Sequence, residues 1–464
     1  MIGKPIRYSL LITLGLFISS SAFATNGYFG HGYGAKNKGL SGGGVALPQD
    51  VMITATNPAG LVFVDERIEL GVTLFSPVRN YSATADANNT PDTTDCGVLP
   101  GNGCPFTIGG NQTAQSIDSD NELFLIPHFA MNWLLSPKAS AGISVYGNGG
   151  MNTEYVGGQA QHDDGSSAPL EGDLITTPGT FGAGTAGVNL EQLFINATYA
   201  RKMSAKTSFG ISAIAAYQRF EAKGLATFGG FSTDSANLSN RGTDDSYGFG
   251  YKLGLQGELV KGLTWGASYQ SEIDMTKFDK YRGLFAEQGD FDIPSTWTMG
   301  LAFDISPKSV ATFDIQHINY GDVPAISNPM NHLINTTSGC AAGVVTRCLG
   351  GSDGAGFGWR DMTIYKLGWQ WMHSSNLTLR AGFSHGKQPI PDSEVVFNIL
   401  APAVIEDHLT LGFTYGVSKD SELTVQYMHG FENSVTGANP LNPGQEVTIE
   451  MDQNELEVSW GWKF

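Results

Sequence analysis

Several stretches of this chain alternate apolar and polar residues one by one. At the C-terminus Leu456, Val458, Trp460, Trp462 and Phe464 alternate with polar or small residues, and 365–371 and 377–383 repeat the pattern. Alternation places all the apolar side chains on one face of an extended strand. A soluble β-sandwich would alternate in the same way. Here, however, the apolar sets end in aromatic residues near the strand ends, which is typical of the girdles of membrane β-barrels.

Short turns allow the strands to be counted. Pairs of alternating segments meet at six polar or Pro/Gly turns, near 137–138, 204–205, 261–262, 307–308, 374–375 and 419–420. These turns join twelve strands, and with one strand at about 67–78 and one at 455–464 the total is about fourteen. Longer polar loops are expected near 80–120, 148–190, 222–244, 274–292, 321–357, 386–406 and 432–452. Short turns at one end and long loops at the other predict a closed, antiparallel transmembrane β-barrel.

Composition narrows the function classes. Among 464 residues there are 60 glycines, 26 Lys+Arg and 44 Asp+Glu, and only 15% of residues are charged. This composition excludes coiled coils, collagen and charge-rich disordered chains. The net charge of −18 argues against nucleic acid as a partner, because such a chain repels phosphate. Beyond the N-terminal segment no apolar run is as long as a membrane-spanning helix requires.

The first residues predict export from the cytoplasm. Residues 1–24 contain Lys4 and Arg7, an apolar stretch at 10–17 and the small-x-small pattern at 22–24. This order is that of a cleaved signal peptide, and the apolar stretch is short for the alternative, an anchoring helix.

Four cysteines fall in two of the long loops. Cys96 and Cys104 lie eight residues apart, as do Cys340 and Cys348. In an exported chain an even count indicates disulfides, and two local pairs are the simplest of the three possible connectivities. Zinc sites generally use closer cysteine pairs than these, so we expect no metal.

Residues 25–65 do not alternate. They are glycine-rich, with Tyr28, Phe29 and Tyr33 interspersed, and they end in the apolar segment 51–64. A disordered tail would need no such apolar content. We therefore expect a plug domain inside the barrel lumen, followed by a barrel domain at 66–464.

A set of short motifs is spread along the chain. It begins with Asn57, Pro58, Ala59 and Gly60 and continues at 153–155, 269–273, 359–361, 379–383 and 389–392 and at the terminal Phe464. This ordered set resembles the FadL family of outer-membrane fatty acid and hydrocarbon transporters, and its first member resembles the hatch motif at the end of the family's plug. The resemblance implies a fourteen-stranded barrel, a plug that closes the lumen, and a lateral opening in the wall beside a kinked strand.

Several side chains are candidates for ligand contact. Tyr28, Phe29 and Tyr33 are expected either to line an apolar pocket or only to pack the plug against the wall. Strand alternation places Arg360, Lys366 and Arg380 on the lumen face. Cations there would offset the burial of a carboxylate head group or, alternatively, join an ion-pair network.

Prolines mark possible defects in the wall and in the plug. Pro77 and Pro127 each remove one hydrogen bond from the strand ladder. Each proline therefore marks either a lateral exit or only a strand end. Asn57-Pro58 makes a rigid turn, which suits a hatch that moves as a unit or a simple link to the first strand.

Catalysis is not expected. Residues 39–43 and 382–386 both match Gly-x-Ser-x-Gly, but neither lies at a strand-to-helix elbow, and chance matches are frequent in a glycine-rich chain. No cofactor signature is present.

The sequence therefore predicts a monomeric outer-membrane barrel that takes up hydrophobic molecules passively. Its other partners would be membrane lipid, lipopolysaccharide and, through Phe464, the assembly machinery. The alternative is a structural or adhesive barrel with disulfide-braced loops and a closed lumen.

Overall fold

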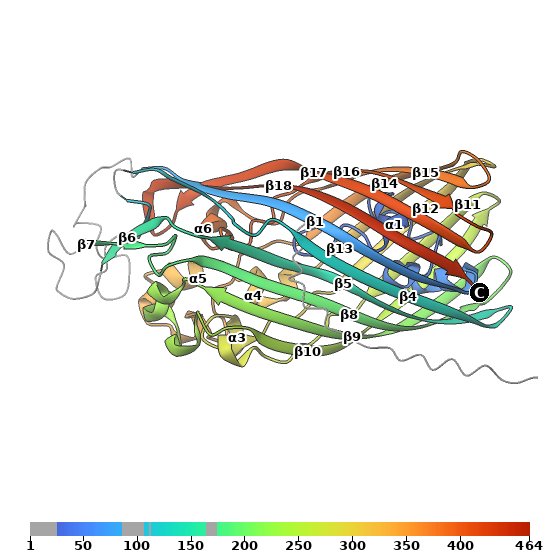
Figure 1. Ribbon diagram of the computed structural model, residues 1–464. Coiled ribbons are helices and arrows are strands. Elements are labelled where there is room, and N and C mark those ends of the chain that lie inside the picture. The colour runs from blue at the N-terminus through green and yellow to red at the C-terminus, as the bar shows by residue number, and fades with distance from the viewer. Residues whose placement is uncertain (1–25, 86–105, 111–112, 164–173) are drawn as a thin grey trace, which may run out of the picture.

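The computed structural model describes residues 26–85, 106–110, 113–163 and 174–464. Fifteen strands form one antiparallel sheet, which closes on itself because β18 also pairs with β1 (Figure 1). One of them, β3 (Gln115–Asp118), adds only to the end of β1, so the barrel has fourteen strands, as predicted. These are β1 (Arg67–Ala83), β4 (Phe124–Ser136), β5 (Ala139–Tyr155), β8 (Ala186–Lys202), β9 (Thr207–Lys223), β10 (Asp244–Val260), β11 (Leu263–Gln270), β12 (Thr296–Ser306), β13 (Ser309–Ile318), β14 (Met362–Met372), β15 (Leu377–Gly386), β16 (Asp407–Gly416), β17 (Ser421–Asn439) and β18 (Asn442–Lys463).

Alternating side chains give the wall an apolar outer face and a polar inner face. Tyr251, Leu253 and Leu255 of β10 are 44–46% exposed, whereas Lys252 and Gln256 between them are buried. Exposed apolar side chains are stable on the outer face only if lipid covers them. The alternation read from the sequence is thus that of a membrane barrel.

The two ends of the barrel differ. All six predicted tight turns are present at the end where the C-terminus lies, and the long connections gather at the opposite end (Figure 1). These connections contain a small sheet of β2 (Thr107–Ile108), β6 (Gln159–Asp163) and β7 (Leu174–Pro178). They also contain short helical turns: η2 (Ala226–Phe231), η3 (Ser235–Asn237), η4 (Asp279–Tyr281), α3 (Ala286–Gly289), η5 (Tyr320–Asp322), α4 (Pro324–Ser327), α5 (Asn331–Ile334), η6 (Cys340–Ala342), η7 (Val345–Arg347), η8 (Asp392–Glu394) and α6 (Val395–Asn398).

One predicted loop is wrong. Residues 432–452 belong almost entirely to β17 and β18, which continue as a hairpin with its turn at 440–441. Outside the lipid a strand needs no apolar outer face, and the outward residues Ser434 and Thr436 are polar. The alternation of apolar and polar residues therefore ends before the two strands end.

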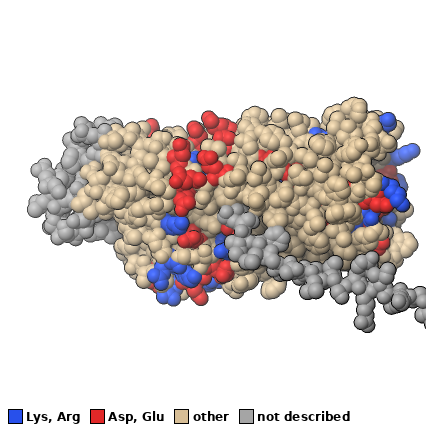
Figure 2. Space-filling view, in the orientation of Figure 1, with Lys and Arg blue, Asp and Glu red and all other residues tan. Residues whose placement is uncertain are grey.

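Acidic side chains gather in a band across the visible face, between the loop end and the long uncharged part of the barrel (Figure 2). Such a band marks the level at which the surface becomes polar. The uncharged stretch beyond it corresponds to the exposed apolar side chains of the strands.

The N-terminal segment contributes only short elements. They are α1 (Ala35–Lys38), α2 (Ile53–Thr56) and the 3₁₀ turn η1 (Pro58–Phe63). In the described part of the chain no helix is both long and apolar enough to cross a membrane.

Candidate functional site

Residues 26–65, which we call the plug, lie inside the barrel against glycines of the wall (Figure 1). A Cβ atom added to Gly254 of β10 would lie 2.1 Å from Asn57 Oδ1, and one on Gly210 of β9 would lie 2.3 Å from the Pro58 carbonyl carbon. A Cβ on Gly266 would lie 2.4 Å from the Val45 oxygen. The plug therefore approaches the wall so closely at these positions that only glycine fits there.

The predicted hatch motif is held firmly. Asn57 donates its side-chain amide to the carbonyls of Val45 (2.8 Å) and Leu255 (3.1 Å) and accepts a hydrogen bond from the Ala59 N–H (3.1 Å). Pro58 begins η1, where its missing N–H costs nothing. These contacts tie the turn to both the plug and the wall.

Buried ion pairs join the plug to the last strands of the barrel. The Lys38 ammonium lies 3.0 Å from a Glu455 carboxylate oxygen and 2.8 Å from Glu457, and all three side chains are at most 4% exposed. Lys36 lies 2.5 Å from Glu422, which also pairs with Arg67 of β1. These residues were not among those predicted from the sequence. The only sign of them was charge within an otherwise alternating strand.

Two of the three predicted lumen cations contact the plug. Lys366 donates to the His31 carbonyl (2.8 Å), and Arg380 donates to Gln49 Oε1 (2.8 Å) and Thr414 (2.7 Å). The lumen placement of Arg360 is wrong. Its exposed side chain precedes the first residue of β14, so strand alternation does not apply to it.

The plug aromatics are packed among loop aromatics. Tyr28 and Phe29 are fully buried, and the Tyr28 ring centroid lies 5.3 Å from that of Tyr320 and 6.0 Å from that of Trp359. Tyr33 packs at 4.8 Å on Tyr146 of β5. The first two thus belong to a continuous apolar cluster of plug, wall and loop side chains.

The wall is interrupted between β4 and β5. Their ladder extends from Ser136↔Ala139 only to Phe129↔Val145, so residues 124–128 have no partner in β5 among the described residues. Beyond that point β5 contains Gly147-Asn148-Gly149-Gly150, and its register against β8 shifts between Gly147 and Gly149. A hollow of about 690 Å³ opens at this break, lined by β1, β4, β5 and the neighbouring strands.

The plug covers the inner side of this break. Gly30 N–H donates to the Asn148 carbonyl (3.0 Å), and Gly150 N–H donates to the Tyr28 carbonyl (2.9 Å). Backbone groups that a regular wall strand would pair are thus paired with the plug. Pro127 lines the hollow, whereas Pro77 pairs with Gln453 on the far side of β1. The three glycines among residues 147–150 were a sign of the break that the sequence prediction missed.

The loops above the lumen are joined to one another. A disulfide links Cys340 and Cys348, and the next residue, Leu349, exchanges backbone hydrogen bonds with Phe231 and Thr233 of the β9–β10 loop. The second predicted pair, Cys96 and Cys104, lies outside the described residues.

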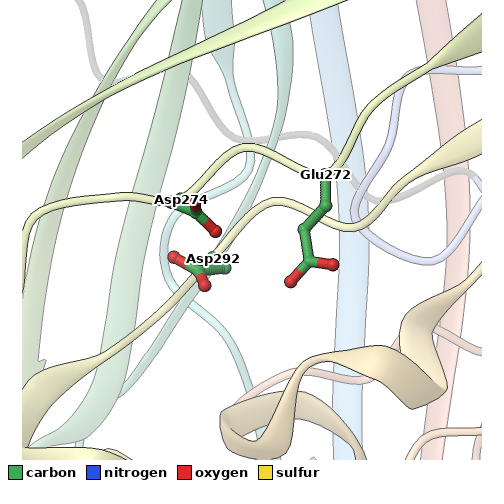
Figure 3. A group of neighbouring side chains, drawn as sticks. All are labelled: Glu272, Asp274 and Asp292. Atoms are coloured by element: carbon green, nitrogen blue, oxygen red, sulfur yellow. The ribbon is translucent and has the colours of Figure 1, made fainter.

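Three carboxylates converge in the β11–β12 loop. Oxygens of Glu272, Asp274 and Asp292 lie within 4.8 Å of one another (Figure 3). Asp292 also accepts a hydrogen bond from the Met275 N–H (2.6 Å), which ties the two ends of the loop together. Burial, with the nearby Asp290 and Asp274 carboxylates, raises the pKa of Asp292 to about 7. The pKa of Glu272 is raised for similar reasons.

Comparison with known proteins identifies the family of this chain. The chain is 20% identical over 315 residues to the long-chain fatty acid transport protein of Escherichia coli, a match that spans 62% of this chain and 66% of that protein. The crystal structure of the Pseudomonas putida toluene transporter TodX matches with a TM-score of 0.60 and 17% identity, over 94% of this chain and 99% of that one. A Pseudomonas aeruginosa FadL homologue matches with a TM-score of 0.65 and 13% identity, over 94% and 100%. A family model described as outer membrane protein transport protein (OMPP1/FadL/TodX) matches residues 15–458, so the chain belongs to this family of outer-membrane transport proteins.

Proposed function

We propose that this protein takes up long-chain fatty acids or hydrocarbons passively and releases them sideways through the barrel wall. The observation that carries this proposal is the hollow at the β4–β5 break, which the Tyr28–Phe29 segment covers from inside. An apolar molecule leaving there enters lipid directly and avoids the polar end of the lumen. The names of the relatives, a fatty acid transporter and a toluene transporter, support the same ligand class.

In this proposal residues 25–65 are a plug domain and residues 66–464 the barrel domain. The many contacts of Asn57 favour an anchoring role for the Asn57–Gly60 motif over a hinge. The movable part is the segment with Tyr28 and Phe29, because it is the part of the plug that covers the break. A ligand that takes the place of these rings among the loop aromatics would free the break.

The chain's other proposed partners are outer-membrane lipid, lipopolysaccharide around the loops, and the assembly machinery at the exposed terminal Phe464. We propose that it acts as a monomer without a cofactor and without catalysis.

The test is uptake of radiolabelled oleate, hexadecane and toluene by cells that lack the gene, with and without complementation. Val145→Trp should fill the hollow and reduce the restored uptake. Ile143→Trp is the matched control, because Ile143 is two residues away on the same outer face and does not line the hollow. Equal uptake by the two variants, both assembled, would contradict lateral release.

A structural or adhesive role is the second candidate. It is favoured by the disulfide-braced loops that cover the lumen and by the apolar cluster beneath them. If the assembled wild-type protein restores uptake of none of the three compounds, this role becomes the better explanation.

A further inference from the structure

A small cavity lies between the plug and the wall strands β10 to β14. Its volume of about 30 Å³ gives room for one or two water-sized occupants. Its wall side includes Lys252, Gln270 and Lys366, and its plug side includes His31 and Ala55. None of the described residues that line it is acidic.

The donors around this cavity lack matching acceptors. Lys252 is 5% exposed, and among the described residues its ammonium has one hydrogen-bond partner, the Ala55 carbonyl, and no carboxylate in an ion pair. Gln270 is 2% exposed, and its Nε2 has no hydrogen-bond partner in the described part of the chain.

Lys366 is only partly compensated. It donates to the His31 carbonyl at 2.8 Å and lies opposite Asp314 in the β13–β14 ladder. The Asp314 carboxylate, however, accepts hydrogen bonds from the Gly44 (2.6 Å) and Val45 (2.8 Å) N–H groups of the plug. It forms no ion pair with Lys366 among the described residues.

A buried ammonium without a counter-charge is unfavourable, and it either loses its proton or acquires an anion. Here two lysines and a free amide donor border one cavity. We propose that the cavity binds one small monovalent anion, held by Lys252, Lys366 and Gln270. Its size fits a halide, because a fatty acid carboxylate would also need apolar space for its chain. The anion would link the plug to the wall beside Ala55, two residues before the Asn57 anchor. This role does not depend on any route of the transported ligand.

The direct test uses crystals of the full mature protein grown in sodium bromide. The expected result is one anomalous peak between the Lys252 and Lys366 ammonium groups. The peak should persist in the control Lys206→Met, a lysine of a tight turn that pairs with Glu258, and be absent in Lys252→Met. If Lys252→Met fails to assemble, Lys252→Arg is used instead. It keeps the positive charge and should keep the peak. A wild-type map without a peak at this position would overturn the proposal.

The unfolding temperature provides a second test of the same site, in solution. Because an anion that binds only the folded state raises the unfolding temperature, chloride should raise it relative to gluconate at equal ionic strength. The increase should occur in wild type and Lys206→Met and vanish in Lys252→Met. Equal increases in all three would contradict the proposal. Adding oleate tests the halide assignment: a retained bromide peak supports it, and a peak lost in favour of a carboxylate would overturn it.

Discussion

Replacing Lys38 by methionine should loosen the plug. Glu455 and Glu457 are at most 1% exposed, and Lys38 is the cation placed between them. Removing one partner of a buried ion pair typically costs about 3–5 kcal/mol, because the remaining charge is buried and uncompensated. At about 1.4 kcal/mol per tenfold, the ratio of seated to released plug should fall roughly a hundredfold to a few thousandfold.

Hydrogen exchange of the plug amides measures this ratio, because they exchange when the plug opens locally. Protection of residues 31–45 should fall by the same factor in Lys38→Met, while the strands of the wall stay protected. Lys36→Met is the matched control, because Glu422 keeps Arg67 and the other carboxylate, Asp50, lies 4.0 Å from the Lys36 ammonium. The loss should therefore be smaller.

A compensated variant separates charge from packing. Lys38→Met combined with Glu455→Gln and Glu457→Gln leaves no uncompensated carboxylate at this position and should recover most of the protection. Unchanged protection in the single variant, or no recovery in the triple one, would refute the reasoning.

Three further predictions concern other parts of the molecule. Gly254→Ala should cost about 1–3 kcal/mol through its clash with Asn57, visible as faster exchange of the plug amides, whereas Gly230→Ala, which meets no atom within 4 Å, should change nothing. The Cys340–Cys348 disulfide closes a loop with a sequence separation of 8, which stabilises the folded loop by about 2.5 kcal/mol in the chain-entropy model. Replacing both cysteines by serine should therefore speed proteolysis of this loop without unfolding the barrel. Asp292 has its pKa raised from 3.8 to about 7, so its contribution to loop stability is full below pH 3.8 and is lost as the pH rises to 7. Exchange in residues 271–295 should therefore show this pH dependence, after correction for intrinsic rates. Asp292→Asn should reduce it and leave the part that Glu272 contributes, because the pKa of Glu272 is also raised.

The barrel was predictable because lipid imposes a rule on every strand that crosses it. Apolar residues must alternate with polar ones, and short turns must follow, so the strand count and the tight turns could be read directly. The rule ends where the lipid ends. That is why the outer hairpin of β17 and β18 was mistaken for a loop, and why Arg360, before the start of β14, was assigned to the lumen.

The site was harder to predict, because its parts meet only in three dimensions. The apolar content of residues 51–64 predicted that the N-terminal segment is packed, but nothing in the sequence around Tyr28 says that it pairs with β5. Glu455 and Glu457 follow the normal inward spacing of a strand. Only the structure places them around Lys38, some four hundred residues earlier in the chain.

The position of these carboxylates has a consequence for biogenesis. The plug precedes every strand of the barrel in the chain and is synthesised before them. The wall carboxylates that pair with Lys36 and Lys38 lie on β17 and β18, the last hairpin. Until that hairpin arrives, the two lysines have no carboxylate partner on the wall, and Lys38 has only the Thr73 hydroxyl of β1. Seating of the plug and sealing of the β1–β18 seam are therefore one coupled event, and a chain truncated before its final hairpin would lack both.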